Sequence, residues 1–97
     1  QRYAARAAAL ANTLESGSGL RVHRPQAGMF AMVDVSATGM SGAAWADDLL
    51  AERGVAVMPG AAFGETLESW VRVALTVDDS RLMEAAARMA AHARIPA

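Results

Sequence analysis

The chain has 97 residues, enough for one small domain but not for two separate hydrophobic cores. Its composition, 54% hydrophobic and 20% charged, is typical of a folded protein and argues against intrinsic disorder. The net charge of −1 argues against a nucleic-acid-binding surface, and no apolar run reaches the roughly 18 residues needed to cross a membrane. We therefore expect residues 1–97 to form a single domain that binds neither nucleic acid nor membrane.

Two residue types are missing from the sequence, and their absence excludes several kinds of chemistry. Without cysteine the chain has no disulfide, no thiolate zinc site and no cysteine nucleophile, which fits a reducing compartment such as the cytoplasm. All nine basic residues are arginines. The chain therefore lacks the lysine that a P-loop needs and the lysine amine that forms a Schiff base.

The first half of the chain predicts a helix followed by two strands. Tyr3, Ala7, Leu10 and Leu14 recur at helical spacing, and the segment Ser16–Gly19 is a stop signal after Leu14. Apolar and polar residues then alternate, which is typical of strands with one buried face. This pattern predicts a short strand at 20–23 and a longer one at 29–35.

The second half predicts helix, strand, strand and helix. Ser41 is a candidate N-cap for a helix that carries Trp45, Leu49 and Leu50 on one side and ends at Gly54. Strands are predicted at 55–58, directly before Pro59, and at 70–75. Asp78 is a candidate N-cap for the last helix, whose apolar residues recur at helical spacing, namely Leu82, Ala86, Met89 and Ala93.

These elements predict an α+β fold, a two-layer sandwich in which helices cover one face of a small, mostly antiparallel sheet. The connections are short and the strands few, which favours antiparallel pairing. The expected core combines residues from the helices and the strands: Leu10, Leu14, Val33, Leu49, Val57, Val73, Leu82 and Met89.

Most of the polar residues do not form a recognisable catalytic or metal-binding pattern. His23 and His92 lie far apart, with no second ligand at metal-binding spacing, so we expect surface or helix-end roles and no metal site. Residues 47–48 and 78–79 are adjacent aspartates, and neighbours on a helix point in different directions. We interpret the first pair as a solvated helix face and the second as a cap.

Arg72 differs from the other charged residues because it lies in the middle of an apolar strand. The alternation places it on the same face as Trp70 and opposite the face of Val71 and Val73. A planar guanidinium at such a position offers two parallel N–H donors to a carboxylate. An arginine on an edge strand is otherwise usually a solvated residue, so strand position alone does not decide its role.

The segment GVAVMPGAAFGETLESWVRVAL, Gly54–Leu75, resembles the C-terminal signature of fold-type-I pyridoxal-phosphate enzymes of the aspartate aminotransferase superfamily. In that family a P-G-x-x-F-G run leads into a strand that bears a single arginine. The turn from Pro25 to Phe30 and the capped last helix follow in the family's order. The runs at 28–41 and 44–64 are also similar to arginine–pyruvate transaminases.

The resemblance implies a role for Arg72 and a context for the domain. The aligned arginine binds the substrate α-carboxylate, and the segment at Phe30 lies near the substrate. The family's catalytic lysine and its other cofactor-binding residues lie in a large upstream domain, so no catalytic, cofactor-binding or metal-binding residue is expected in this chain. The full enzyme would then be a homodimer that uses pyridoxal 5'-phosphate, an amino acid and a 2-oxo acid. This chain would be its C-terminal domain and inactive alone.

Two other interpretations remain open on the sequence. A lyase or an acyltransferase can be built on the same pyridoxal-phosphate scaffold. Alternatively, the chain is a non-catalytic α+β module that binds a ligand or regulates a partner, and the P-G-x-x-F-G segment is only a turn.

Overall fold

The computed structural model describes residues 2–23 and 29–93. In these ranges the helices are α1 (Arg2–Gly17), α2 (Gly42–Arg53) and α3 (Asp79–His92). The strands are β1 (Arg21–His23), β2 (Phe30–Asp34), β3 (Met58–Pro59) and β4 (Trp70–Ala74). Short 3-10 turns join them at η1 (Ser36–Thr38), η2 (Gly60–Phe63) and η3 (Glu65–Leu67). The helices and strands follow one another in the predicted order. Most of the turn predicted before β2, residues 25–28, lies outside the described residues.

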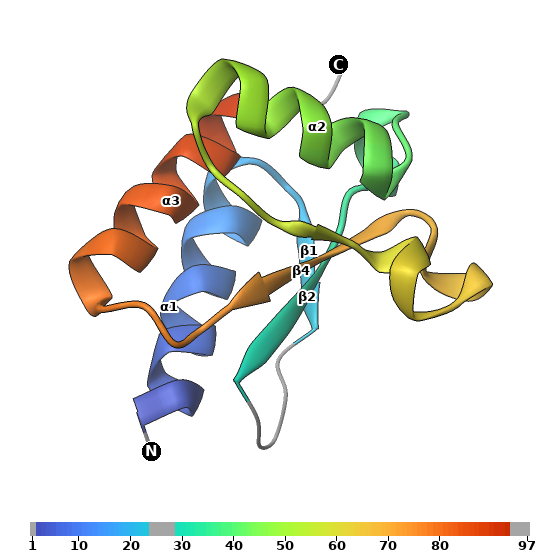
Figure 1. Ribbon diagram of the computed structural model, residues 1–97. Helices are drawn as coiled ribbons and strands as arrows, with labels where there is room; N and C mark the ends of the chain where they lie inside the picture. Colours follow the sequence, from blue (N-terminus) through green and yellow to red (C-terminus); the bar gives the residue numbers. More distant parts are fainter. Residues whose placement is uncertain (1, 24–28, 94–97) are drawn as a thin grey trace.

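The four strands form one antiparallel sheet in the order β1-β2-β4-β3. β2 and β4 are its centre, and they pair along their whole length, from Phe30 opposite Ala74 to Asp34 opposite Trp70. Helices α1 and α3 lie side by side against the sheet, and α2 crosses at the top of the view in Figure 1. This arrangement confirms the predicted two-layer α+β fold.

The alternation of side chains along β2 and β4 explains why only one face of the sheet is covered. The residues that point toward the helices are buried: Ala31, Val33, Val71 and Val73. They pack with the apolar side of each helix in a single core cluster. The residues between them, including Met32 and Arg72, are only half-buried and belong to the opposite face.

The predicted helix caps are confirmed. The Ser41 hydroxyl accepts a hydrogen bond from the Ala44 N–H at 3.2 Å, and the Asp78 carboxylate accepts one from the Arg81 N–H at 2.9 Å. Gly54 follows α2 with a φ of 68°, a left-handed conformation that suits glycine. Helix α1 continues past Leu14 to Gly17, so the Ser16–Gly19 segment ends the helix later than its first serine suggested.

Two predictions were wrong, and a third was met only in part. Leu50 was expected on the buried side of α2, but its side chain is 55% exposed, because the helix packs through Trp45 and Leu49. The strand predicted at 55–58 is reduced to Met58–Pro59, which lie at the sheet edge and pair only with β4. Val57 precedes this pairing and is only partly buried, although it packs against the core cluster. The other seven predicted core residues are buried.

Candidate functional site

The candidate site is centred on Arg72, on the face of the sheet that the helices leave uncovered. Arg72 lies in the middle of β4, opposite Met32 of β2 and Met58 of β3. Its neighbours Val71 and Val73 are buried on the helix side, so the strand itself directs the Arg72 side chain the other way. The predicted orientation of Arg72 is therefore confirmed.

Two aromatic rings enclose the guanidinium of Arg72. Its Cζ lies 3.9 Å from the ring centroid of Phe30 and 4.1 Å from the ring centroid of Phe63. Phe30 comes from the neighbouring strand β2, and Phe63 comes from the η2 turn after Pro59. A cation over an aromatic face is stabilised by the ring quadrupole. The guanidinium therefore contacts one ring from a strand and one from a turn.

One donor of Arg72 is buried without a hydrogen-bond partner. The Nε atom is inaccessible to solvent and has no acceptor among the described residues. Leaving a buried donor unpaired costs about 1–3 kcal/mol, so an acceptor that reached it would be strongly favoured. A carboxylate provides two coplanar oxygens, which match two neighbouring N–H groups on one edge of a guanidinium.

Gly60 holds the η2 turn close to the sheet and so positions Phe63. A Cβ atom at Gly60 would overlap the backbone oxygen of Leu67 and would lie 2.7 Å from the backbone oxygen of Trp70. Only glycine allows this close approach. The turn begins directly after Pro59, and four residues later the chain reaches Phe63 over the guanidinium. The P-G-x-x-F-G spacing therefore has a structural reason at this site.

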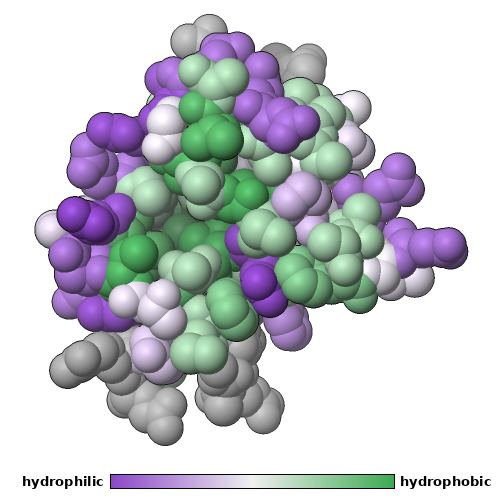
Figure 2. All heavy atoms as spheres, in the orientation of Figure 1, coloured by the Kyte–Doolittle hydropathy of each residue, from purple (hydrophilic) through white to green (hydrophobic). Residues whose placement is uncertain are grey.

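Two hollows lie near β4. The smaller one, of about 220 Å³, adjoins the guanidinium and is lined by Phe30, Ala56, Val57, Met58, Arg72 and Ala74. The larger one, of about 470 Å³, lies between α3 and residues 54–57, where hydrophobic side chains gather on the face shown in Figure 2. Of the charged residues that line the larger hollow, Glu84 and Arg88 already pair with each other at 2.6 Å. Arg72 lines only the smaller of these two hollows, so the smaller hollow is the one associated with the candidate site.

The structure brings together the two predicted site residues and adds a third. Phe30 was predicted near the substrate and contacts Arg72. Phe63 was not among the predicted site residues, and its contact with Arg72 could not be inferred from spacing, because it depends on how tightly the η2 turn folds back. Trp70 is half-buried on the same strand but does not take part in the cation–π contacts with Arg72.

The histidines and paired aspartates were predicted to have surface, helix-end or capping roles, and some of them also make contacts that were not predicted. His23 is exposed, as expected. His92 is the last residue of α3, the helix-end position that was expected, but its Nε2 lies 2.8 Å from a carboxylate oxygen of Asp48, a contact that spacing in the sequence did not predict. Asp48 is therefore not a purely solvated residue. Asp78 caps α3, and Asp79 accepts a hydrogen bond from Arg6 Nε at 2.8 Å.

In the described ranges 2–23 and 29–93, every helix is too short or too polar to cross a lipid bilayer.

Comparison with known proteins gives a consistent result along most of the chain. The model of one family, aminotransferase class I and II, matches residues 1–89. The arginine–pyruvate transaminase of Pseudomonas aeruginosa is 44% identical over 77 residues, which are 79% of this chain and 20% of that protein. The 4-dedimethylamino-4-oxo-anhydrotetracycline transaminase of Streptomyces rimosus is 41% identical over 88 residues, 91% of this chain and 23% of that protein. The chain spans about a fifth of the length of these curated relatives.

Solved structures show the same similarity in three dimensions. The aromatic aminotransferase from Pyrococcus horikoshii matches 93% of this chain and 24% of its own, with a TM-score of 0.86 and 29% identity. The aspartate aminotransferase from Thermus thermophilus, solved with maleate, matches 94% of this chain and 23% of its own, with a TM-score of 0.81 and 30% identity.

Proposed function

Because the chain belongs to the aminotransferase class I and II family, we propose that it is the C-terminal domain of a pyridoxal-phosphate-dependent aminotransferase. In this proposal the complete enzyme transfers an amino group between an amino acid and a 2-oxo acid, and Arg72 binds the α-carboxylate of the substrate. The observation that carries the proposal is the Arg72 guanidinium, held between two rings with a buried, unpaired Nε.

The chemistry of Arg72 suits a carboxylate better than a compact anion. A guanidinium forms two parallel charge-assisted hydrogen bonds to a carboxylate, which fixes the orientation of the bound group as well as its position. The rings of Phe30 and Phe63 lie 3.9 and 4.1 Å from the guanidinium carbon and take the place of water there, and an ion pair is stronger where water is excluded. Maleate, found in the Thermus thermophilus structure, is itself a dicarboxylate and is consistent with such a role.

The cofactor would be held outside this chain. The family implies pyridoxal phosphate, which supplies the electron sink for amino-group transfer when it is bound. The 97 residues include no lysine, so the chain does not provide the amine that attaches this cofactor. We place that attachment in an N-terminal large domain, and this chain contributes the group that binds and orients the substrate.

Replacement of Arg72 in the full-length enzyme tests the proposal. Truncating one partner of a desolvated charge pair costs about 2–5 kcal/mol, so Arg72→Ala should lower kcat/KM for amino acids by roughly 30-fold to several thousand-fold. Arg72→Lys should recover little activity, because an ammonium keeps the charge but loses the planar pair of donors. Steady-state kinetics with the amino acid and the 2-oxo acid measure both effects.

Two controls separate carboxylate binding from a general loss of structure. A primary amine without a carboxylate, such as benzylamine, should react about equally slowly with the wild type and with Arg72→Ala. Arg21, an exposed arginine on β1 of the same sheet, provides the matched variant Arg21→Ala, which should retain wild-type kinetics. Amino-acid turnover by Arg72→Ala within about threefold of wild type would contradict the carboxylate role.

We also propose that the complete enzyme is a cytoplasmic homodimer, as the family resemblance implies. Light scattering of the full-length protein measures the molar mass directly. A mass equal to that of one chain would contradict the dimer, and it would leave the role of Arg72 to be decided by the kinetics above.

A further inference from the structure

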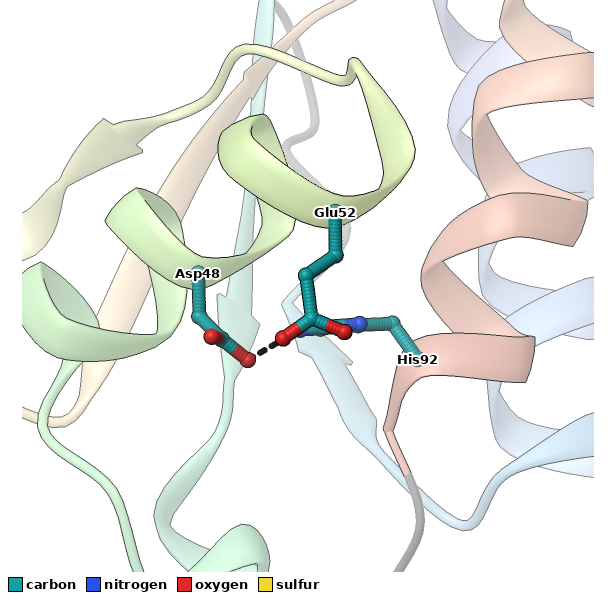
Figure 3. Close-up of side chains that lie close together, drawn as sticks. All are labelled: Asp48, Glu52 and His92. Carbon is teal, nitrogen blue, oxygen red and sulfur yellow. Dashed lines mark ion pairs between the residues drawn. The ribbon is translucent and has the colours of Figure 1, made fainter.

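Three ionisable side chains converge where the C-terminal halves of α2 and α3 meet, away from the Arg72 site. Asp48 and Glu52 lie one turn apart on α2, and His92 is the last residue of α3 (Figure 3). Residues four apart on a helix project from the same side. One nitrogen and two carboxylate oxygens, one atom from each residue, all lie within 4.8 Å of one another.

The imidazole of His92 is held in place before any ligand arrives. Its side chain is only 7% exposed, and its ring packs at a tilt against the ring of Trp45, with centroids 5.8 Å apart. Nε2 donates to Asp48 at 2.8 Å, and Nδ1 accepts from Arg53 Nε at 3.4 Å. The ring therefore points Nε2 at the two carboxylates, and folding has already removed most of the water around the ring before a metal ion binds.

We propose that Asp48, Glu52 and His92 bind a divalent transition-metal ion, with zinc the best match. Zinc takes imidazole nitrogen and carboxylate oxygen at about 2.0–2.2 Å, which separates tetrahedral donors by about 3.3–3.6 Å. The three donor atoms are close enough to reach that spacing through a small rotation of Glu52, which is exposed. Magnesium and calcium prefer all-oxygen sites, so the imidazole argues against them.

Binding would move one proton within the His92 ring and exchange two hydrogen bonds for the metal bonds. The ion takes the place of the Nε2 proton, and the ring takes up one proton at Nδ1, so no net proton is released; the two carboxylates balance the charge of the ion. A neutral ring bound through Nε2 carries its proton on Nδ1, where Arg53 now donates. Arg53 must therefore leave that contact. Its positive charge also opposes the ion, so removing Arg53 should strengthen binding.

Isothermal titration of the 97-residue chain with zinc chloride tests the proposal, with far-UV circular dichroism to confirm that each variant is folded. The wild type should bind one zinc ion saturably. His92→Gln and Asp48→Asn should each weaken binding by at least about tenfold, and Glu52→Gln by about threefold or more. Asp48→Asn keeps an oxygen that can accept the hydrogen bond from His92, so it should fold even if His92→Gln does not.

Matched variants distinguish this site from weak binding elsewhere on the surface. The other histidine, His23, is exposed, and Glu68 is an exposed carboxylate, so His23→Gln and Glu68→Gln should change the zinc Kd by less than about twofold. Arg53→Gln should lower the Kd, by about threefold or more. This opposite sign is not expected of a variant that merely damages the fold.

A second readout locates the ion. In a Trp70→Phe background Trp45 is the remaining tryptophan, and its ring contacts that of His92, so nickel bound at this site should quench its fluorescence. The quenching should be lost in Asp48→Asn. The proposal is overturned if zinc binding is not saturable up to about 1 mM, if Asp48→Asn binds as tightly as wild type, or if Arg53→Gln binds more weakly.

Discussion

The two rings that enclose the Arg72 guanidinium are not equally secured. Phe30 lies on the central strand β2, whereas Phe63 lies on a surface turn with 45% of its area exposed. Because nearly half of its surface is exposed, replacing Phe63 should cost less folding stability than replacing a fully buried residue. Phe63 is therefore the ring whose replacement can be interpreted through the site alone.

We predict that Phe63→Leu lowers the affinity of the full-length enzyme for carboxylate substrates. A cation–π contact is worth about 0.5–2 kcal/mol, so kcat/KM should fall by about 2-fold to 30-fold while turnover of an amine without a carboxylate is unchanged. Phe63→Tyr keeps the aromatic face and should stay near wild type. If Phe63→Leu and Phe63→Tyr behave alike, the ring has no role in holding Arg72.

A second residue-scale prediction concerns Asp78, the N-cap of α3. The backbone N–H of Arg81 and the hydroxyl of Ser80 both donate to Asp78, and together they lower the pKa of its carboxyl below the usual 3.8. A carboxyl whose pKa is lower in the folded state stabilises the fold fully above its unfolded pKa. That stabilisation is lost as the pH falls through the folded pKa.

Thermal unfolding at several pH values checks this prediction. The Tm of wild type should exceed that of Asp78→Asn by a constant amount from pH 5 to pH 7, and the difference should shrink below about pH 3.8. Asparagine still accepts the Arg81 hydrogen bond, so Asp78→Ala should melt below Asp78→Asn at pH 7. A wild-type advantage that grows on acidification would contradict the stated sign.

At the scale of elements, α2 offers two adjacent leucines in opposite environments. Leu49 is fully buried, and Leu50 is mostly exposed. Leu49→Ala should lower the free energy of unfolding by about 2–5 kcal/mol, because it leaves a cavity in the core, whereas Leu50→Ala should cost less than about 1 kcal/mol. Urea unfolding of the 97-residue chain measures both. Equal losses would mean that the α2 face has been assigned incorrectly.

The elements also show what a sequence can and cannot predict. Ser41 and Asp78 bond to an N–H three residues away, so the information for each cap lies in a short stretch of sequence. The length of β3 could not be predicted in this way, because it depends on how far a separate strand, β4, extends beside it. The inner face of α2 was only partly predictable, since Leu49 and Leu50 are equally apolar and only the packing distinguishes them.

The candidate site also combines features that the local sequence predicts with features that depend on how distant segments pack. The direction of Arg72 followed from the alternation along one strand, and its proposed role rests on the family resemblance. The contact with Phe63 depends on the backbone approach at Gly60, which has no signature beyond the glycine itself. The pair of His92 and Asp48 joins two helices that are distant in the sequence, and no local pattern predicts which helix ends meet.

For the whole molecule, the main feature is the difference between the two faces of the sheet. The helices cover one face, and the other carries apolar side chains that the domain leaves open, including Met58 and Phe63. Exposed apolar surface of this kind commonly marks a contact with another domain or chain. In the proposed enzyme the N-terminal large domain is the partner for this face.

Methionine oxidation tests this assignment. In the 97-residue chain Met58 is 47% exposed and Met89 is buried, so dilute peroxide should convert Met58 to its sulfoxide at least about tenfold faster than Met89. In the full-length protein the rate at Met58 should approach that at Met89, as measured by peptide mass spectrometry. Equally fast oxidation of Met58 in both proteins would place the large domain elsewhere.

Strand β4 has a neighbouring strand on each side and buried residues on its inner face, so its amides should exchange with solvent only when the whole domain opens. The η2 turn packs against the sheet at Gly60 but is not paired within it, so it should open more often. The segments that carry Arg72 and Phe63 should therefore open at very different rates, although the two side chains are in contact. On warming, the contact between Phe63 and the Arg72 guanidinium should therefore be lost well before strand β4 unfolds. The affinity for an anion should decline before the fold does.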